Sequence, residues 1–376
     1  MPEPTLVRSG RIRVTPFTER LESFGVNAYS VYNGILLADS IGSNSLEDDY
    51  WHLRRHVQIW DVGCQKQLEI KGRDAQRLVQ LMTPRNIEKL KVGQCAYAPI
   101  IDQHAHLLND PVIIKKAPDH YWLSLADSDI FLWAKGFATG FGLNVEIEEP
   151  EVYPLALQGP KAEDLMAKVF GETIRPIRYF RFGMFDFEGH PFLIARSGWS
   201  KQGGFEIYLD RPELGSNLWD TMWQAGQEFK IAPGYPNEIE RIEGGLLSYG
   251  NDMTDEHNPL ECGMDRYCDL DDDIDYLGRE ALLKIRSTGV TRLIRGIHLP
   301  GAPLSKTRDE WAVQDDKQNE VGQVSSMLWS PALKTNIGIC MVEKNFWLAE
   351  SRVHVATPEG ICPAEICDMP MKVPSA

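Results

Sequence analysis

Several common signatures are missing from this sequence of 376 residues. It has no GxGxxG or GxxxxGK[ST] segment, which argues against a dinucleotide-binding or P-loop fold. The absence of GxSxG and HExxH segments disfavours hydrolysis by a serine triad or by zinc. No apolar run approaches the roughly 20 residues of a membrane span, and the first residues contain no hydrophobic stretch. We therefore expect a cytoplasmic protein without a membrane partner.

Paired cysteines and excess positive charge are missing as well. The seven Cys residues show no CxxC spacing, so we expect buried free thiols. The net charge of -15 argues against a nucleic-acid partner. His257, Cys262 and Cys268 come nearest to a metal cluster, but their spacing matches no common zinc pattern, and we expect no metal. The acidic run 269–275 lacks the glycine and the glutamate of an EF-hand loop, which favours a solvated loop.

The sequence pattern predicts an α+β fold with more than one domain, because one hydrophobic core stops growing at about 250–300 residues. The order strand, turn, helix occurs twice, at QKQLEIKG with the helix after it and at YPLALQGPKAEDLMAKVF. Short strand-like runs separated by Gly, Pro and Asn begin near residue 290 and predict a small C-terminal β-domain. We expect a first region over 1–289, with an approximate split near 150, and a second over 290–376.

Two acidic residues are candidates for chemistry. Asp110 stands among apolar strand residues in LLNDPVII, where it either serves a ligand or caps a hairpin turn. In GGFEIYLD, the alternation places Glu206 and Tyr208 on one face of a strand, opposite its apolar residues. The preceding Gly203 and Gly204 allow a ligand to approach the backbone closely.

The segment ARSGWSKQ combines fixed positive charge with an aromatic face. Arg196, Trp199 and Lys201 suit a ligand with an anionic end and an onium centre, and a surface hairpin with a packed Trp is the alternative. In ERIEGG, Arg241 and Glu243 form either an internal ion pair or the support of a site.

Ordered motifs along most of the chain from about residue 50 resemble the folate-dependent aminomethyltransferase family, which includes the glycine-cleavage T-protein. The segments that carry the resemblance are LLNDPV, LQGPKAEDLM, ARSGWSKQGGFEIY, ERIEGGLLSYGNDM, YLGREAL and GQVSSMLWSPALKTNIG. T-proteins typically have an Arg-Thr-Gly-Tyr-Thr-Gly-Glu run where this chain has the residues 196–202. That stretch, with VGQCAY, NDPV and YWLSLAD, is similar instead to the demethylases of dimethylsulfoniopropionate. One segment departs from them, since Gly34 stands in YNGILLA where those demethylases usually read Tyr-Asn-His-Met-Leu-Leu-Pro.

The resemblance implies a three-domain cloverleaf of two ferredoxin-like α+β units and a C-terminal β-barrel, with tetrahydrofolate in a central channel. It also implies that the two α+β domains interleave, with chain from beyond residue 150 completing part of the N-terminal domain. It implies a tetrahydrofolate-dependent methyltransferase that acts on a small sulfonium substrate. By the same resemblance, Asp110 is the catalytic residue that orients the folate, and Glu206 binds its pterin. The remaining implied residues are Tyr97, Tyr208 and Arg241 for the folate pocket, and Trp199, Lys201, Trp122 and Ser124 for the substrate.

Two other functions remain open on sequence alone. One keeps the fold and the folate but uses another donor, such as a betaine, an N-methylated amino acid or the glycine-cleavage intermediate. The other is a folate-binding module without catalysis, against which the joint presence of Asp110 and Glu206 argues.

Overall fold

The computed structural model describes residues 9–304 and 310–374. Residues 1–8 lie outside the described part, so the structure does not bear on the expectation that was drawn from the absence of a hydrophobic stretch in the first residues. The chain divides into two compact units. The first contains the chain up to Leu68, Glu149–Gly198 and Gln202–Pro236, and the second contains Glu69–Glu148, Trp199–Lys201 and the chain from Asn237 onward.

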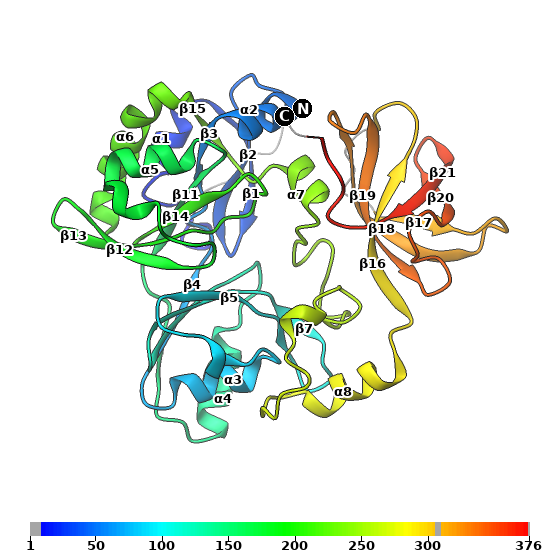
Figure 1. The fold of residues 1–376 in the computed structure, drawn as a ribbon, viewed down its shortest axis with the longest axis horizontal. Coiled ribbons are helices and arrows are strands. Elements are labelled where there is room, and N and C mark those ends of the chain that lie inside the picture. The colour runs from blue at the N-terminus through cyan, green and yellow to red at the C-terminus, as the bar shows by residue number, and fades with distance from the viewer. Residues whose placement is uncertain (1–8, 305–309, 375–376) are drawn as a thin grey trace. The chain divides into compact units, whose positions relative to one another are not determined.

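The first unit is built on a six-stranded sheet in the order β12-β13-β14-β11-β3-β15. Helices α5 and α6 cover one face of this sheet (Figure 1), where Leu165 and Trp219 pack with Phe205 and Ile207 in one buried core. A separate hairpin, β1-β2, precedes the sheet in the chain. The elements are α1 (Thr18–Glu22), β1 (Val26–Tyr32), β2 (Ile35–Ile41), α2 (Leu46–Arg55), β3 (Val57–Asp61), β11 (Tyr153–Gln158), α5 (Ala162–Phe170), β12 (Phe182–Phe187), β13 (His190–Ala195), β14 (Gly204–Leu209), α6 (Gly215–Gly226) and β15 (Ile231–Gly234).

The second unit contains a five-stranded sheet in the order β10-β4-β9-β8-β5 and a closed barrel. Gln76 of α3 accepts hydrogen bonds from Lys115 and Tyr121, so α3 covers that face of the sheet. The alternate residues of the strands, among them Tyr97 and Trp122, lie on the other face. The elements before the barrel are β4 (Gln67–Lys71), α3 (Ala75–Met82), β5 (Gln94–Tyr97), β6 (Ile100–Ile101), β7 (Leu107–Asn109), β8 (Val112–Ala117), β9 (His120–Ser124), α4 (Phe131–Gly140), β10 (Glu146–Glu148), α7 (Glu238–Gly244) and α8 (Arg279–Thr288).

The barrel closes in the order β16-β19-β18-β17-β20-β21 around a buried core in which Val is the most frequent residue, and it is drawn from yellow to red in Figure 1. This confirms the predicted C-terminal β-domain and, with the mixed sheets, the predicted α+β class. Its strands are β16 (Arg292–Leu299), β17 (Trp311–Gln314), β18 (Glu320–Ser330), β19 (Thr335–Glu343), β20 (Arg352–Thr357) and β21 (Gly360–Cys367). The linear split near residue 150 stays a prediction.

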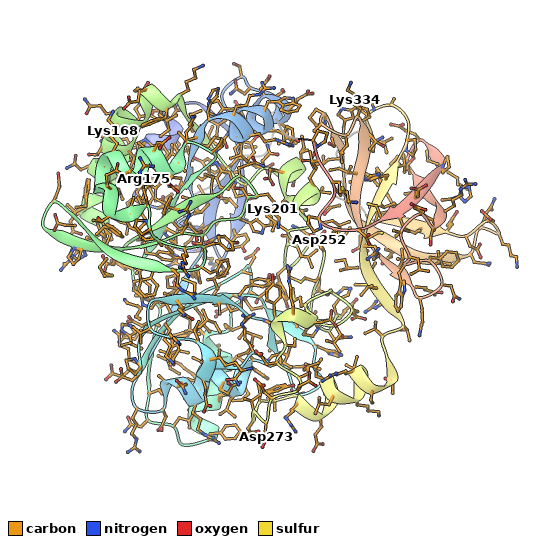
Figure 2. The ribbon with its side chains drawn as sticks, in the orientation of Figure 1. Lys168, Arg175, Lys201, Asp252, Asp273 and Lys334 are labelled. Atoms are coloured by element: carbon orange, nitrogen blue, oxygen red, sulfur yellow. The ribbon has the colours of Figure 1, made fainter. Side chains whose placement is uncertain are left out.

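The acidic run before α8 is a loop with exposed carboxylates, as the sequence predicts. The Asp273 side chain is fully exposed (Figure 2), whereas Asp269 and Asp272 lie within 4 Å of the Lys89 ammonium. Cys262 and Cys268 are core thiols, which confirms their predicted role. Among the described residues, no three His, Cys, Asp or Glu side chains gather as a metal site. None of the described helices is long and apolar enough to cross a bilayer.

Candidate functional site

In the second unit, Asp110 lies in the short turn between β7 and β8, and the residues on either side of it are fixed. The fully buried Asn109 side chain donates to the Ala126 carbonyl at 3.1 Å and to Ser128 Oγ at 2.8 Å. On the other side, the Pro111 carbonyl accepts from the Ala98 amide at 3.1 Å. Asp110 therefore projects from a rigid turn. Sequence reasoning missed Asn109, because its partners lie 17 and 19 residues away.

The two carboxylate oxygens of Asp110 have different environments. Oδ2 accepts a hydrogen bond from the Tyr97 hydroxyl at 2.6 Å, whereas Oδ1 is shielded from water and receives none from another described residue. Burial raises the pKa of Asp110 to about 7, and the Tyr97 hydrogen bond opposes that rise. Burial and the Asp110 charge raise the pKa of Tyr97 well above its usual value, so Tyr97 remains a donor. A buried acceptor without a donor suits a ligand that brings an N–H group.

In the first unit, Glu206 and Tyr208 lie on one face of β14, as the alternation predicts, while Phe205 and Ile207 join the core on the other. The Glu206 carboxylate is buried and accepts hydrogen bonds from the hydroxyls of Ser197 and Tyr208. Burial raises the pKa of Glu206, and the two hydroxyl donors oppose that rise.

The glycines beside Glu206 make room for a side chain of the protein itself. A Cβ added to Gly204 would lie 2.4 Å from Nε2 of Gln158, and one added to Gly198 would lie 2.0 Å from the same atom. The sequence suggested that a ligand approaches the backbone here, whereas at Gly204 the group that lies close to the backbone is the Gln158 side chain. The Gln158 Nε2 donates to the Ser197 carbonyl at 3.1 Å. Sequence reasoning found neither Gln158 nor Ser197, since their contacts depend on strand register.

The cationic side chains of the segment 196–201 have separate roles. Arg196 belongs to the first unit, where it pairs with Glu163 and donates to two carbonyls. Trp199 and Lys201 belong to the second unit. The Arg241 guanidinium carbon lies 5.8 Å from the Trp199 ring centroid. The backbone amide of Lys201 donates to the Glu240 carboxylate at 2.8 Å. The Lys201 side chain packs against Gly244, where an added Cβ would lie 3.0 Å from Lys201 Cγ.

Arg241 forms a buried ion pair with Asp252 at 2.8 Å and donates to Ser326 of β18 at 2.7 Å. Asp252 and Lys201 are labelled in Figure 2. Glu243 accepts from Ser330 at 2.6 Å, so Arg241 and Glu243 each bond to a separate partner. The place of Arg241 in a folate pocket stays a prediction.

Trp122 and Ser124 lie on the face of the five-stranded sheet that also bears Tyr97, with Val112 paired to both Tyr97 and Ser124. The Trp122 indole donates to Glu69 at 2.8 Å, and the Lys116 ammonium lies 3.3 Å from its ring centroid. This ring thus already has a cation of the protein on its face.

Comparisons with known proteins cover nearly the whole chain. The family model of the GCVT N-terminal domain matches residues 18–272, and that of the glycine cleavage T-protein C-terminal barrel domain matches residues 292–372. The chain is 46% identical over 358 residues to the dimethylsulfoniopropionate demethylase DmdA of Ruegeria pomeroyi, covering 95% of this chain and 97% of that protein. It is 30% identical to an aminomethyltransferase of Koribacter versatilis, covering 87% of this chain and 85% of the relative.

Among solved structures, the glycine cleavage system aminomethyltransferase T of Bartonella henselae has the same fold. The TM-score is 0.84 at 20% sequence identity, with 96% of this chain and 98% of that chain covered. This likeness confirms the predicted T-protein-like architecture. The folate channel stays a prediction.

Proposed function

The chain belongs to the glycine-cleavage T-protein family, and on that premise we propose that it is a tetrahydrofolate-dependent methyltransferase that demethylates dimethylsulfoniopropionate. The products are methylthiopropionate and 5-methyltetrahydrofolate. The observation that carries this proposal is the near full-length similarity to the demethylase of Ruegeria pomeroyi. The buried acceptors of Asp110 and Glu206 fit a co-substrate that is rich in N–H donors.

The proposed reaction is a direct displacement at the methyl carbon. The carbon–sulfur bond breaks with its electron pair on sulfur, which leaves as a neutral thioether, and the N5 lone pair of tetrahydrofolate forms the new carbon–nitrogen bond. N5 then loses its proton. A sulfonium is already an activated methyl donor, so the protein must mainly hold the two reactants in line, which supplies up to about 7–11 kcal/mol of the barrier reduction.

We assign Asp110 to the N5 position of the folate. Its Oδ1 is free to accept a hydrogen bond, and its raised pKa of about 7 suits a group that takes up a proton near neutral pH. Tyr97 fixes the other oxygen and lines the folate pocket in this proposal, together with Arg241.

We assign Glu206 to the amino edge of the pterin, with Tyr208 beside it. A carboxylate accepts two parallel N–H donors well, and this one has no cation of the protein as partner among the described residues. The N–H donors of a bound pterin would offset part of the free-energy cost of burying the Glu206 carboxylate.

We assign the sulfonium to Trp199, with Lys201 as the partner of the substrate carboxylate. Trp122 and Ser124 are weaker candidates, because the Lys116 ammonium lies only 3.3 Å from the Trp122 ring centroid, whereas the Arg241 guanidinium carbon lies 5.8 Å from that of Trp199. The cation–π contribution is about 2 kcal/mol in a dry site. Trp199→Leu should therefore raise KM for the sulfonium by about 30-fold, while Trp199→Phe keeps most of the affinity. Unchanged kinetics of Trp199→Leu would refute this assignment.

An anaerobic assay tests the function itself. Purified protein is incubated with tetrahydrofolate and dimethylsulfoniopropionate, and 5-methyltetrahydrofolate and methylthiopropionate are followed by chromatography with mass detection. Glycine betaine and dimethylglycine serve as alternative donors in parallel. We expect both products in equal amounts from the sulfonium alone. Turnover of a different donor would keep the methyltransferase activity and change its substrate, and folate binding without turnover of any donor would contradict the proposal.

A further inference from the structure

The immediate surroundings of Glu206 contain hydroxyl groups in place of a cation. Its described partners are the Ser197 and Tyr208 hydroxyls, and no described Lys, Arg or His side chain forms an ion pair with it. An ionised carboxylate offers about four lone-pair positions, so about two remain for the donors of a ligand. Such a ligand binds well only while the carboxyl is ionised, because the protonated form presents a donor to other donors.

Ser197 is held so that its hydroxyl reaches Glu206. The side chain is 4% exposed, and its Oγ donates to Glu206 Oε2 across the β13–β14 connection. The Ser197 carbonyl accepts from Gln158 Nε2, and that amide lies against the Cα atom of Gly198. The backbone of Ser197 is therefore fixed from β11, and the hydroxyl keeps its direction without help from a ligand.

We propose that Ser197 is a positioning residue for folate binding, which keeps Glu206 ionised and oriented toward the paired N–H donors at the guanidine-like edge of a pterin. The folate part of this inference rests on the proposed function. The effect on Glu206 does not, since it concerns the ligand-free protein.

The other charged groups of the same sheet are directed elsewhere. Burial raises the pKa of Glu206, and no neighbouring charge contributes to the shift. Glu206 pairs with Ala156 on β11 and with Ala195 on β13, so its neighbours on both adjacent strands are uncharged. The titratable residues on the other strands of this sheet are Asp61, Tyr153 and His190 on the core side, and Asp186, which is on the same side as Glu206 but exposed on the edge strand. Arg196, which follows β13, pairs with Glu163.

A titration of the ligand-free protein tests the positioning role directly. Glutamate labelled with carbon-13 at the carboxyl gives a resonance for Glu206, which Glu206→Gln identifies by its loss. Ser197→Ala should raise the pKa of Glu206 by about one pH unit, because the carboxylate loses a hydrogen bond to its charged form. Ser197→Thr retains the hydroxyl and should titrate as wild type. Ser30→Ala, which removes a hydroxyl from β1 in the same unit, is the matched control.

Tetrahydrofolate affinity as a function of pH is the second readout. In Ser197→Ala the loss of affinity on acidification should begin about one pH unit higher, which makes binding about tenfold weaker within that interval. An unshifted Glu206 titration in Ser197→Ala would overturn the inference and leave the proposed function intact. Wild-type protein that binds no tetrahydrofolate at any pH would instead refute the proposed function, and with it the folate part of the inference.

Discussion

At the scale of single residues, the buried Asp110 carboxyl should reduce the free energy of unfolding at pH values where it is ionised. Its pKa is raised to about 7 in the folded state, above the usual value of 3.8. The folded protein therefore binds a proton more tightly than the unfolded chain. The stability linked to this proton is complete below pH 3.8 and is lost as the pH rises through about 7.

Asp110→Asn should separate stability from activity. We expect methyl transfer to fall by about 100-fold or more, the usual contribution of a group that handles a proton. The free energy of unfolding should rise by about 2 kcal/mol at pH 8, because the amide carries no charge to bury. At pH 4 the gain should nearly vanish. Urea denaturation at both pH values measures the difference.

Asp273→Asn is the control, since its side chain is fully exposed in the loop before α8. It should change neither activity nor the pH dependence of stability. If the difference in unfolding free energy between Asp110→Asn and wild type is the same at pH 4 and at pH 8, burial does not destabilise the ionised Asp110 carboxylate, and the prediction is wrong.

The sequence located some of these residues and missed others for a physical reason. Alternation along one strand sufficed to put Glu206 and Tyr208 on one face, and the structure confirms this. Ser197 and Asn109 act through partners on other strands or loops. Their roles follow from register and loop packing, which a single sequence does not encode locally.

At the scale of elements, the hairpin β1-β2 explains the departure at Gly34. Asn33 and Gly34 both have positive φ, 53° and 72°, and join strands that pair from Tyr32 and Ile35 outward. Asn-Gly between two strands is typical of a tight type I′ turn. The sequence therefore contains a clear hairpin signal at Asn33 and Gly34.

The connection between β13 and β14 should be sensitive to one glycine and tolerant at another. Gly198 has φ of 141°, and an added Cβ would lie 2.0 Å from Gln158 Nε2. Gly198→Ala should cost about 2–4 kcal/mol of unfolding free energy from backbone strain and the displaced amide. Gly203→Ala, with positive φ but open space around its Cα, should cost only about 1 kcal/mol. Thermal unfolding distinguishes the two, and equal losses would contradict the contact with Gln158.

At the scale of the whole molecule, the sequence predicted the α+β class and the C-terminal β-domain, and both are confirmed. The two compact units are each assembled from separate stretches of the chain, with residues 199–201 in the second unit and both neighbouring segments in the first. The expected division near residue 150 stays a prediction. Periodicity identifies elements by their own residues, but membership of a unit depends on contacts made far along the chain.

Within the second unit, Arg241 connects α7 to the barrel and should be a major contributor to stability. Arg241→Met leaves Asp252 buried without its cation and should cost about 3 kcal/mol or more. Arg286→Met removes an ion pair of the same 2.7–2.8 Å length whose side chains are 45% and 89% exposed, and it should change stability by less than about 0.5 kcal/mol. Urea unfolding measures both, and similar small effects would contradict the importance of the buried pair.

The contact of Gln158 with Gly198 and Gly204 also has a consequence for protein engineering. A library randomised at position 198 alone should return almost only glycine, because every other side chain meets the Gln158 amide. Randomising positions 158 and 198 together gives selection a route to a smaller residue at 158 and an alanine at 198. Positions 158, 198 and 204 should therefore be varied together in any redesign of this region.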